Sequence, residues 1–482
     1  VSSAFVRTRR SSISMLPGLA RPCFGAAPRQ SLRRAARATR LLSASRDRHL
    51  SVAAPADLAH VAAAATTSAA ASSSSFDIDQ LARQPMTSLS LNDLYRVASS
   101  PTDEQNLLNA QFVRRELPIR YAHRCAQLRN LPFGLAADER IEHAARTYEQ
   151  QAEALFLHPK PVDASSKRSF DSLLRSSQPK LLEVPEHIGT ALAARLHAEG
   201  GEADADADRT QQRVIDTHLD EFFLARIGQR FLIEHYLASS GSSGAEQRPG
   251  FSGIIQSRCS PFEVVEQAAA ETFLLCSARL GVCPQIEVRG DRDASFTYVP
   301  KHIFFVASEL LKNAAAATVD FHASRGGGGG LPPVRIVVAC GENEMAIKVA
   351  DEGGGIARSR LAEVWSYRGA RLAGGFGLAA RSDADELVRS PEASAGLGLP
   401  LARLHCKFFG GSLHLTPMEG YGTDSYAKLN RLGDDNCEDL PQAVRESYGM
   451  EAAEPSAAVN QWYARRGLQV GDLLYDAQAR RG

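Results

Sequence analysis

A glutamate and an asparagine stand four residues apart, at Glu309 and Asn313, in a segment whose apolar pattern predicts a helix. Four residues make about one helical turn, so both side chains project from the same face. An asparagine oxygen suits Mg²⁺, which prefers hard oxygen ligands. A glutamate one turn earlier can accept a proton from an attacking hydroxyl. Such a pair also occurs on ordinary helix surfaces, so its meaning depends on the motifs that follow.

An aspartate, Asp351, directly follows the apolar run of residues 345–350, which predicts a strand. An acidic side chain at a strand end can accept a hydrogen bond from an adenine amino group. Gly353 and Gly355 follow it, and glycine permits positive φ and close approach of the backbone to a ligand. A glycine triplet after a strand is usually a plain turn, so this motif is not decisive alone.

A second glycine turn precedes a predicted helix start at Pro400, because proline is favoured in the first helical turn. Backbone N–H groups at a helix start favour phosphate. The residues of this turn are Gly396, Leu397, Gly398 and Leu399, and a Gly-Thr-Asp segment with Thr423 at its centre follows. The ordered set of motifs, within strand and helix context, predicts a site for ATP.

The four motifs resemble those of the Bergerat-fold ATPases, the group that includes Hsp90, type II topoisomerases, MutL and histidine kinases. Within that group the chain resembles the mitochondrial 2-oxoacid dehydrogenase kinases, which act on the pyruvate and branched-chain complexes. The resemblance covers about residues 85–430 and includes further segments at residues 116–124, 131–133, 219–232, 298–302 and 418–424.

This resemblance implies roles for individual residues. Glu309 would be the general base, Asn313 would bind Mg²⁺, and Asp351 would bind the adenine of ATP with support from Thr423. Ser366 would be a residue of the ATP site at the hinge of an ATP lid over residues 366–395. The substrate would be a serine of the E1 component, which phosphorylation would switch off. The partners would be the lipoyl domain of the E2 core and a second copy of the chain, in the mitochondrial matrix.

The expected fold is α plus α/β, with an N-terminal four-helix bundle followed by a Bergerat α/β sandwich. The helical pattern is longest over residues 209–239, and residues 202–208 are expected to be an acidic loop before it. The apolar stripe of this helix consists of Val214, Ile215, His218, Leu219, Phe222, Phe223, Ile227, Phe231, Leu232 and Tyr236. The expected domains are a transit peptide and linker (1–75), the bundle (76–246), the ATP domain (247–432) and a tail (433–482).

Composition limits the function classes. The 482 residues suggest two or three domains, and 44% hydrophobic residues allow a buried core. A net charge of zero predicts no field for nucleic acid, and the lack of a run of about 20 apolar residues predicts no membrane span. Eight cysteines without a CxxC pair favour a reducing compartment over a disulfide framework.

The first 46 residues are rich in arginine and serine and contain no acidic residue, which is typical of an organelle transit peptide. A disordered basic tail is the alternative. Residues 62–75, rich in alanine, serine and threonine, are expected to be a linker.

The glycine run of residues 326–330 lacks the GK[ST] ending of a phosphate loop, so it is interpreted as a flexible insertion.

Several positions depart from the family pattern. A histidine one turn before the base is replaced by Phe305, an arginine of the asparagine helix by Ala316, and the first glycine of the second turn by Ser394. The lid sequence after Tyr367 is also altered, and the bundle histidine has no aligned match, the nearest being His187. These departures leave open a catalytically weak ATP-binding scaffold.

A histidine kinase is the other alternative. It would need a phospho-accepting histidine next to a glutamate, but His123 is followed by Arg124. The sequence does not distinguish the pyruvate from the branched-chain complex as target, and it does not identify allosteric effectors.

Overall fold

The structure is a computed structural model that describes residues 75–87, 89, 91–99, 102–198, 205–240, 249–325, 330–342, 344–367 and 397–431. Several predictions therefore lie outside the described residues. These are the transit peptide and nearly all of its linker, the first four glycines of the glycine run, Gly396, Ser394, the predicted lid beyond Tyr367, and the C-terminal tail.

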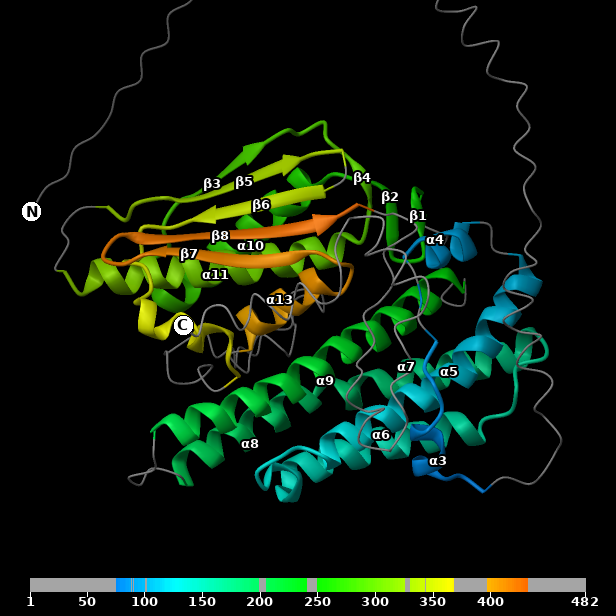
Figure 1. Ribbon diagram of the computed structural model, residues 1–482. Coiled ribbons are helices and arrows are strands. Elements are labelled where there is room, and N and C mark those ends of the chain that lie inside the picture. The colour runs from blue at the N-terminus through cyan, green and yellow to red at the C-terminus, as the bar shows by residue number, and fades with distance from the viewer. Residues whose placement is uncertain are drawn as a thin grey trace, which may run out of the picture. The chain divides into compact units, whose positions relative to one another are not determined.

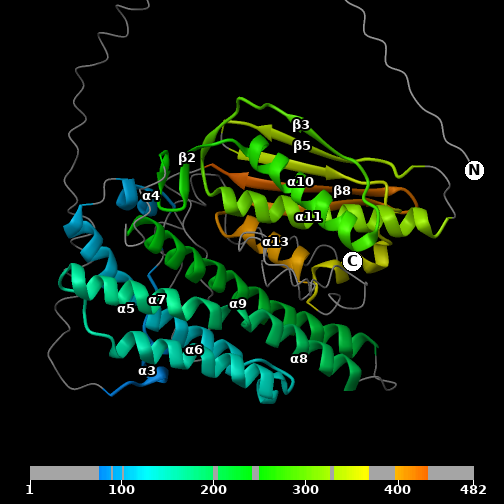
Figure 2. The ribbon, with the colours of Figure 1, turned by 180° about the vertical axis from the view of Figure 1, so that it is seen from behind.

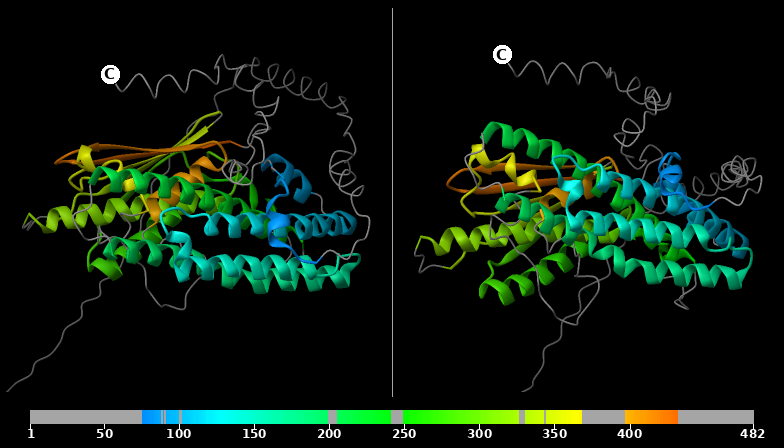
Figure 3. Two further views of the ribbon diagram at one scale, coloured as in Figure 1. Left: turned by 60° about the horizontal axis from the view of Figure 1, so that its bottom comes forward. Right: turned by 90° about the horizontal axis from the view of Figure 1, so that it is seen from below.

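The first part of the described chain is helical. Its elements are α3 (Ile78–Ala82), α4 (Leu91–Ser99), α5 (Asp103–Arg129), η1 (Leu135–Ala137), α6 (Glu139–Leu157), α7 (Ala164–Leu182), α8 (Val184–Ala198) and α9 (Ala205–Ser239). The helices coloured cyan to green lie side by side in both further views (Figure 3), and α5 contacts α6, α7 and α9. The expectation of a helical domain over this part is confirmed.

Helix α9 differs from its prediction at two places. It begins at Ala205, so residues 205–208 are helical and not part of an acidic loop. Alanine is the best helix former, and acidic side chains favour the positive end of the helix dipole, so a first turn of this composition is stable. Val214, expected in the apolar stripe, is 37% exposed, whereas Ile215, Leu219 and Phe222 are buried.

The second part of the chain contains two sheets. A three-stranded sheet has the order β1-β2-β4, from β1 (Phe251–Ser252), β2 (Ile255–Cys259) and β4 (Phe296–Tyr298). A five-stranded sheet has the order β3-β5-β6-β8-β7, from β3 (Ile286–Gly290), β5 (Val334–Cys340), β6 (Glu344–Ala350), β8 (Gly422–Asn430) and β7 (Ser412–Met418). Only the β3–β5 pair in this sheet is parallel. Strands β5 and β6 pair antiparallel, and the strand predicted over residues 345–350 is confirmed as part of β6.

Three helices cover one face of the five-stranded sheet, as Figures 1 and 2 show: α10 (Pro261–Leu280), α11 (Pro300–Ala323) and α13 (Gly398–Lys407). Burial alternates along β5 and β6, because successive side chains point to opposite faces of a sheet. Met345, Ile347 and Val349 of β6 are buried. Two short 3-10 helices, η2 (Arg358–Arg360) and η3 (Glu363–Trp365), follow the sheet strand β6 along the chain.

One continuous hydrophobic core includes buried residues from both the helices of the first part and the α/β part. An aromatic cluster joins them. The ring centre of Phe231 in α9 lies 5.7 Å from the ring centre of His302 in α11 and 5.3 Å from that of Phe409, which follows α13. In the part of the chain that the structure describes, no helix is long and apolar enough to cross a membrane.

Candidate nucleotide site

Helix α11 carries two of the predicted site residues, Glu309 and Asn313, in line with Ala317. Glu309, Asn313 and Ala317 occupy successive turns of this helix, four residues apart. At 1.5 Å per residue, the eight residues from Glu309 to Ala317 span about 12 Å. The helix begins at Pro300 in the favourable first-turn position, and its buried face fixes it against the sheet and its neighbour α10. Both glycine turns reach this line of residues, one at each end.

The carboxylate of Glu309 is buried and already paired. Its exposed fraction is 5%, and its Oε1 accepts a hydrogen bond from Nζ of Lys312, one turn along the helix and 8% exposed. A Cβ added to Gly398 would lie 2.1 Å from Oε2 of Glu309. The start of α13 therefore lies directly against the predicted base, and a side chain at position 398 would displace that carboxylate.

Asn313 lies in the middle of this line and is exposed. Its side-chain Nδ2 donates to the backbone oxygen of Glu309 at 2.7 Å, so the amide is oriented by its own helix. The amide oxygen Oδ1 is then the atom that can bind a cation. Among the described residues no group of three His, Cys, Asp or Glu side chains forms a metal cluster. A single oxygen ligand fits Mg²⁺ in ATP sites, where phosphates and waters supply the other oxygens.

Asp351 begins the loop at the far end of the line. Its Oδ1 accepts hydrogen bonds from the backbone N–H groups of Gly353, at 2.9 Å, and Thr423, at 3.1 Å. The backbone N–H of Asp351 in turn donates to the backbone oxygen of Thr423 at 3.1 Å. The structure thus brings the predicted adenine ligands Asp351 and Thr423 together across β6 and β8. Both backbone bonds go to Oδ1, and the other carboxylate oxygen, Oδ2, takes neither of them.

Burial raises the pKa of Asp351 above the ordinary aspartate value, and the nearby charge of Asp424 also raises it. The two backbone hydrogen bonds oppose this rise because they stabilise the charged form.

The glycines after Asp351 are fixed by close contacts. A Cβ on Gly353 would lie 2.6 Å from Cβ of Ala317, and one on Gly355 would lie 2.2 Å from the backbone oxygen of Met418. Gly355 has φ of +70°, as the prediction of positive φ expects, whereas Gly353 is required by its contact with α11. The loop is therefore wedged between α11 and the turn from β7 to β8.

The two ends of this row of α11 residues face different chemical groups. The Glu309 end meets the N-terminus of α13, whose backbone N–H groups form an anion-binding type of surface. The Ala317 end meets the Asp351 loop, which offers a carboxylate acceptor. Asn313 lies between them. This arrangement suits a molecule with phosphates near Glu309 and a nucleobase near Asp351.

Not all predicted residues join this line. The hydroxyl of Ser366 donates to Oδ1 of Asp216 in α9 at 3.1 Å. Leu397 is buried in the core and Leu399 packs against it, so a ligand role for either would use the backbone. The sequence did not indicate a role for Lys312, the ion-pair partner of the predicted base, although it lies between Glu309 and Asn313 in the chain.

Phe305, one of the positions that depart from the family pattern, contacts a histidine of another helix. The ring of Phe305, one turn before Glu309, lies 4.3 Å from the ring of His405 in α13. The ring of His405 also lies 4.9 Å from that of His302. A histidine is thus in contact with the position where the family pattern has one, but it comes from another helix.

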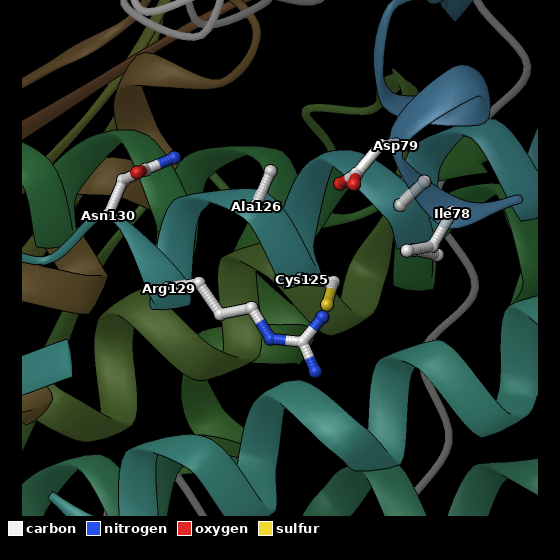
Figure 4. A pocket seen from close by; sticks show the side chains of 7 residues that line it. Ile78, Asp79, Cys125, Ala126, Arg129 and Asn130 are labelled. Atoms are coloured by element: carbon white, nitrogen blue, oxygen red, sulfur yellow. The ribbon is translucent and has the colours of Figure 1, made fainter. Parts of the chain in front are cut away.

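A cavity of about 210 Å³ lies elsewhere, between α3 and α5 (Figure 4). Its lining is Ile78, Asp79, Ala122, Cys125, Ala126, Arg129 and Asn130. The guanidinium of Arg129 is already bound to Glu142 at 3.1 Å and Glu149 at 2.7 Å. None of the predicted nucleotide-site residues lines this cavity, and we assign it no role in that site.

Comparison with known proteins decides the family. Residues 88–256 match the family described as mitochondrial branched-chain alpha-ketoacid dehydrogenase kinase, and residues 298–432 match the histidine kinase-, DNA gyrase B-, and HSP90-like ATPase family. A mitochondrial [pyruvate dehydrogenase (acetyl-transferring)] kinase of Arabidopsis thaliana is 31% identical over 372 residues, which cover 76% of this chain and 96% of the relative. The chain belongs to the mitochondrial 2-oxoacid dehydrogenase kinase family.

Other relatives in this family agree. The mitochondrial pyruvate dehydrogenase kinase of Schizosaccharomyces pombe is 30% identical over 418 residues, covering 74% of this chain and 96% of the relative. Isozyme 1 of Rattus norvegicus is 25% identical over 372 residues, covering 76% of this chain and 82% of the relative. The match to the ATPase family places an ATP-binding domain at residues 298–432. The names of the kinase relatives support a mitochondrial protein.

Proposed function

We propose that this protein is an ATP-dependent protein serine kinase that phosphorylates, and so inactivates, the E1 component of a 2-oxoacid dehydrogenase complex. One observation supports the site most strongly. Gly398 lies against Glu309 and Gly353 lies against Ala317, so both glycine turns meet the same helix α11 on either side of Asn313. The names of the relatives support the dehydrogenase complex as the partner.

The reaction assigns a task to each end of α11. The adenine amino group donates to Asp351, and the phosphates lie near the first N–H groups of α13 and Asn313. The hydroxyl oxygen of the substrate serine attacks the γ-phosphorus, and the bond from that phosphorus to the bridging oxygen of ADP breaks. The serine proton passes to the carboxylate of Glu309. Asn313 would hold Mg²⁺, and the bound ion would supply positive charge that offsets the phosphate charge during transfer.

The ion pair with Lys312 sets a condition on this chemistry. The Glu309 carboxylate is held by Lys312 and closed off by Gly398 in the structure. A substrate hydroxyl can reach it only if the side chain of Glu309 turns from its present contact or if α13 shifts at its first turn. The proposed proton transfer to Glu309 therefore requires one of these local movements.

The finer assignments follow the family. We propose that the helical part forms a four-helix bundle that docks on the lipoyl domain of the E2 core. We also propose that the protein is a homodimer of the mitochondrial matrix. The arginine-rich, acid-free start of the sequence supports the mitochondrial address.

The test is phosphate transfer from labelled ATP to purified pyruvate E1 and branched-chain E1, assayed side by side. One E1 should be labelled on serine. Glu309→Gln should lower the transfer rate by about 10²- to 10⁴-fold, the usual contribution of a general base, while ATP binding persists. The matched control is Glu344→Gln, since Glu344 is an exposed carboxylate of β6 paired with Lys428.

Other outcomes would change the assignment. Label on neither E1 by a protein that binds ATP would favour the scaffold, for which the buried and paired state of Glu309 is the supporting observation. Acid-labile label on a histidine of the protein itself would point to a histidine-kinase type of reaction.

A further inference from the structure

One carboxylate of the helical part contacts residues on both sides of the segment between Tyr367 and Leu397. Oδ1 of Asp220 in α9 accepts from the hydroxyl of Tyr367 at 2.8 Å. Oδ2 of the same side chain accepts from Nη2 of Arg403 in α13 at 2.7 Å. Tyr367 precedes that segment and Arg403 follows it, so a single side chain of α9 ties its two flanks together.

A second carboxylate lies one turn earlier on α9. Oδ1 of Asp216 accepts from the hydroxyl of Ser366 and from the backbone N–H of Tyr367, each at 3.1 Å. Gln212 orients this carboxylate through a bond of 2.8 Å from its Nε2 to the same oxygen. Helix α9 therefore holds Ser366 and Tyr367 by their side chains and by the backbone.

Aromatic contacts complete the attachment. The ring of Tyr367 stacks on that of Phe223 in α9 at 5.4 Å, with 19° between the planes, and Tyr367 is 2% exposed. The guanidinium of Arg403 lies 5.1 Å from the ring centre of Trp365. Burial raises the pKa of both Asp216 and Asp220, and the charge of Arg403 opposes this for Asp220. Because both carboxylates are largely removed from water, they depend on these hydrogen-bond donors for stabilisation.

The attachment reaches the nucleotide site through α13. Arg403 and Gly398 belong to the same ten-residue helix, and Gly398 lies against the carboxylate of Glu309. A helix of this length moves as a unit, so the contact at Arg403 fixes where its N-terminus meets α11. The same carboxylate that holds Arg403 also holds Tyr367.

We propose that Asp216 and Asp220 are positioning residues for the ATP site, which hold Ser366–Tyr367 and helix α13 in the geometry that nucleotide binding requires. The inference rests on the proposed function, because it concerns the same site. Neither aspartate contacts the reacting atoms. Their effect passes through Tyr367 and through Arg403.

The experiment compares Asp220→Asn, Asp216→Asn and Tyr367→Phe in the full-length protein. Asparagine keeps the shape of aspartate but removes the charge that Arg403 meets. The measurements are the Kd for ATP by equilibrium binding, the KM for ATP and kcat, and the thermal midpoint. We expect Asp220→Asn to raise the Kd and the KM for ATP at least tenfold, with kcat at saturating ATP within about threefold. Asp216→Asn and Tyr367→Phe should raise both by smaller factors.

The matched control is Glu234→Gln. Glu234 is also a carboxylate of α9 that bonds to the α/β part, through Lys301 of α11 at 2.9 Å, and its other ion pair is with Arg230 of its own helix. Its variant should bind ATP within twofold of the wild type. In addition, Asp220→Asn combined with Tyr367→Phe should raise the Kd by less than the product of the single effects, because the two residues share one contact.

The outcomes separate this inference from the proposed function. Wild-type affinity for ATP in both Asp220→Asn and Asp216→Asn would overturn the positioning role alone. A lower thermal midpoint with unchanged Kd and KM would also overturn it, since that result describes a purely structural contact. If Asp220→Asn does not fold, the milder Tyr367→Phe decides by the same two constants. A wild-type protein that binds no ATP would overturn the proposed function and this inference with it.

Discussion

The ion pair of Glu309 and Lys312 is nearly closed off from solvent, with side-chain exposures of 7% and 10%. Removing one partner of a buried pair leaves a charge that neither water nor protein compensates, which costs about 3–5 kcal/mol. We therefore expect Lys312→Met to lower the free energy of unfolding by about 3 kcal/mol, measured by urea denaturation. Adding Glu309→Gln to Lys312→Met should restore part of that loss. An unchanged stability in the single variant would contradict the pairing.

The raised pKa of Asp351 predicts how ATP binding depends on pH. An adenine amino group needs an acceptor, so binding favours the ionised carboxylate. Since burial raises the pKa, protonation on acidification begins at a higher pH than for an ordinary aspartate, whose pKa is about 3.9. The affinity for ATP should therefore fall on the acid side earlier than that value predicts, while the protein remains folded by circular dichroism. Asp351→Asn should bind ATP weakly at every pH and lose this acid limb.

Much of the site at this scale was predictable because its signals are local. The spacing of Glu309 and Asn313 and the position of Asp351 after a strand need only neighbouring residues. The partner of Ser366 was not predictable, because Asp216 stands 150 residues earlier and nothing near either residue indicates the other. In the structure the hydroxyl of Ser366 bonds to Asp216 of α9, and a contact of Ser366 with the nucleotide stays a prediction.

At the scale of elements, two glycines make different contacts and should respond differently to substitution. A Cβ at position 398 would meet the end of the flexible Glu309 side chain at 2.1 Å, whereas a Cβ at position 422 would meet the backbone oxygen of Asp351 at 1.9 Å. A side chain can move aside, but the backbone of a wedged loop cannot do so without a larger shift.

We expect Gly398→Ala to lower kcat for phosphate transfer by tenfold or more, with a loss of stability below about 1 kcal/mol, because it displaces the base. Gly422→Ala should lower the free energy of unfolding by about 1–3 kcal/mol, as overpacking usually does. Kinetics and urea denaturation of both variants check this. Equal effects of the two on stability would contradict the structure.

The elements themselves were well predicted where periodicity is long. The long helix over residues 209–239 is confirmed within α9, and the strand over residues 345–350 is confirmed within β6. The start of α9 was wrong because acidic composition was interpreted as a solvated loop, although alanine and aspartate suit a first helical turn. The strand order, with β3 beside β5 and β8 between β6 and β7, depends on contacts far apart in sequence and could not be derived from local pattern.

At the scale of the molecule, the shared core predicts cooperative unfolding. The hydrophobic cluster runs through both parts, and Phe231, His302 and Phe409 join α9 to the α/β part. We expect thermal unfolding to show one transition, with the same midpoint by far-ultraviolet circular dichroism and by fluorescence of Trp365 in a Trp462→Phe background. Coincident transitions are the test of two-state behaviour. Two separated midpoints would show that the parts unfold independently.

The bonds of Asp220 to Tyr367 and Arg403 also predict how substitutions at this position should be tolerated. Because one carboxylate accepts from both side chains, a change at position 220 removes the acceptor of two donors at once. A buried donor such as the Tyr367 hydroxyl costs about 1–3 kcal/mol when it loses its acceptor. Natural variation at position 220 should therefore occur together with changes at positions 367 and 403.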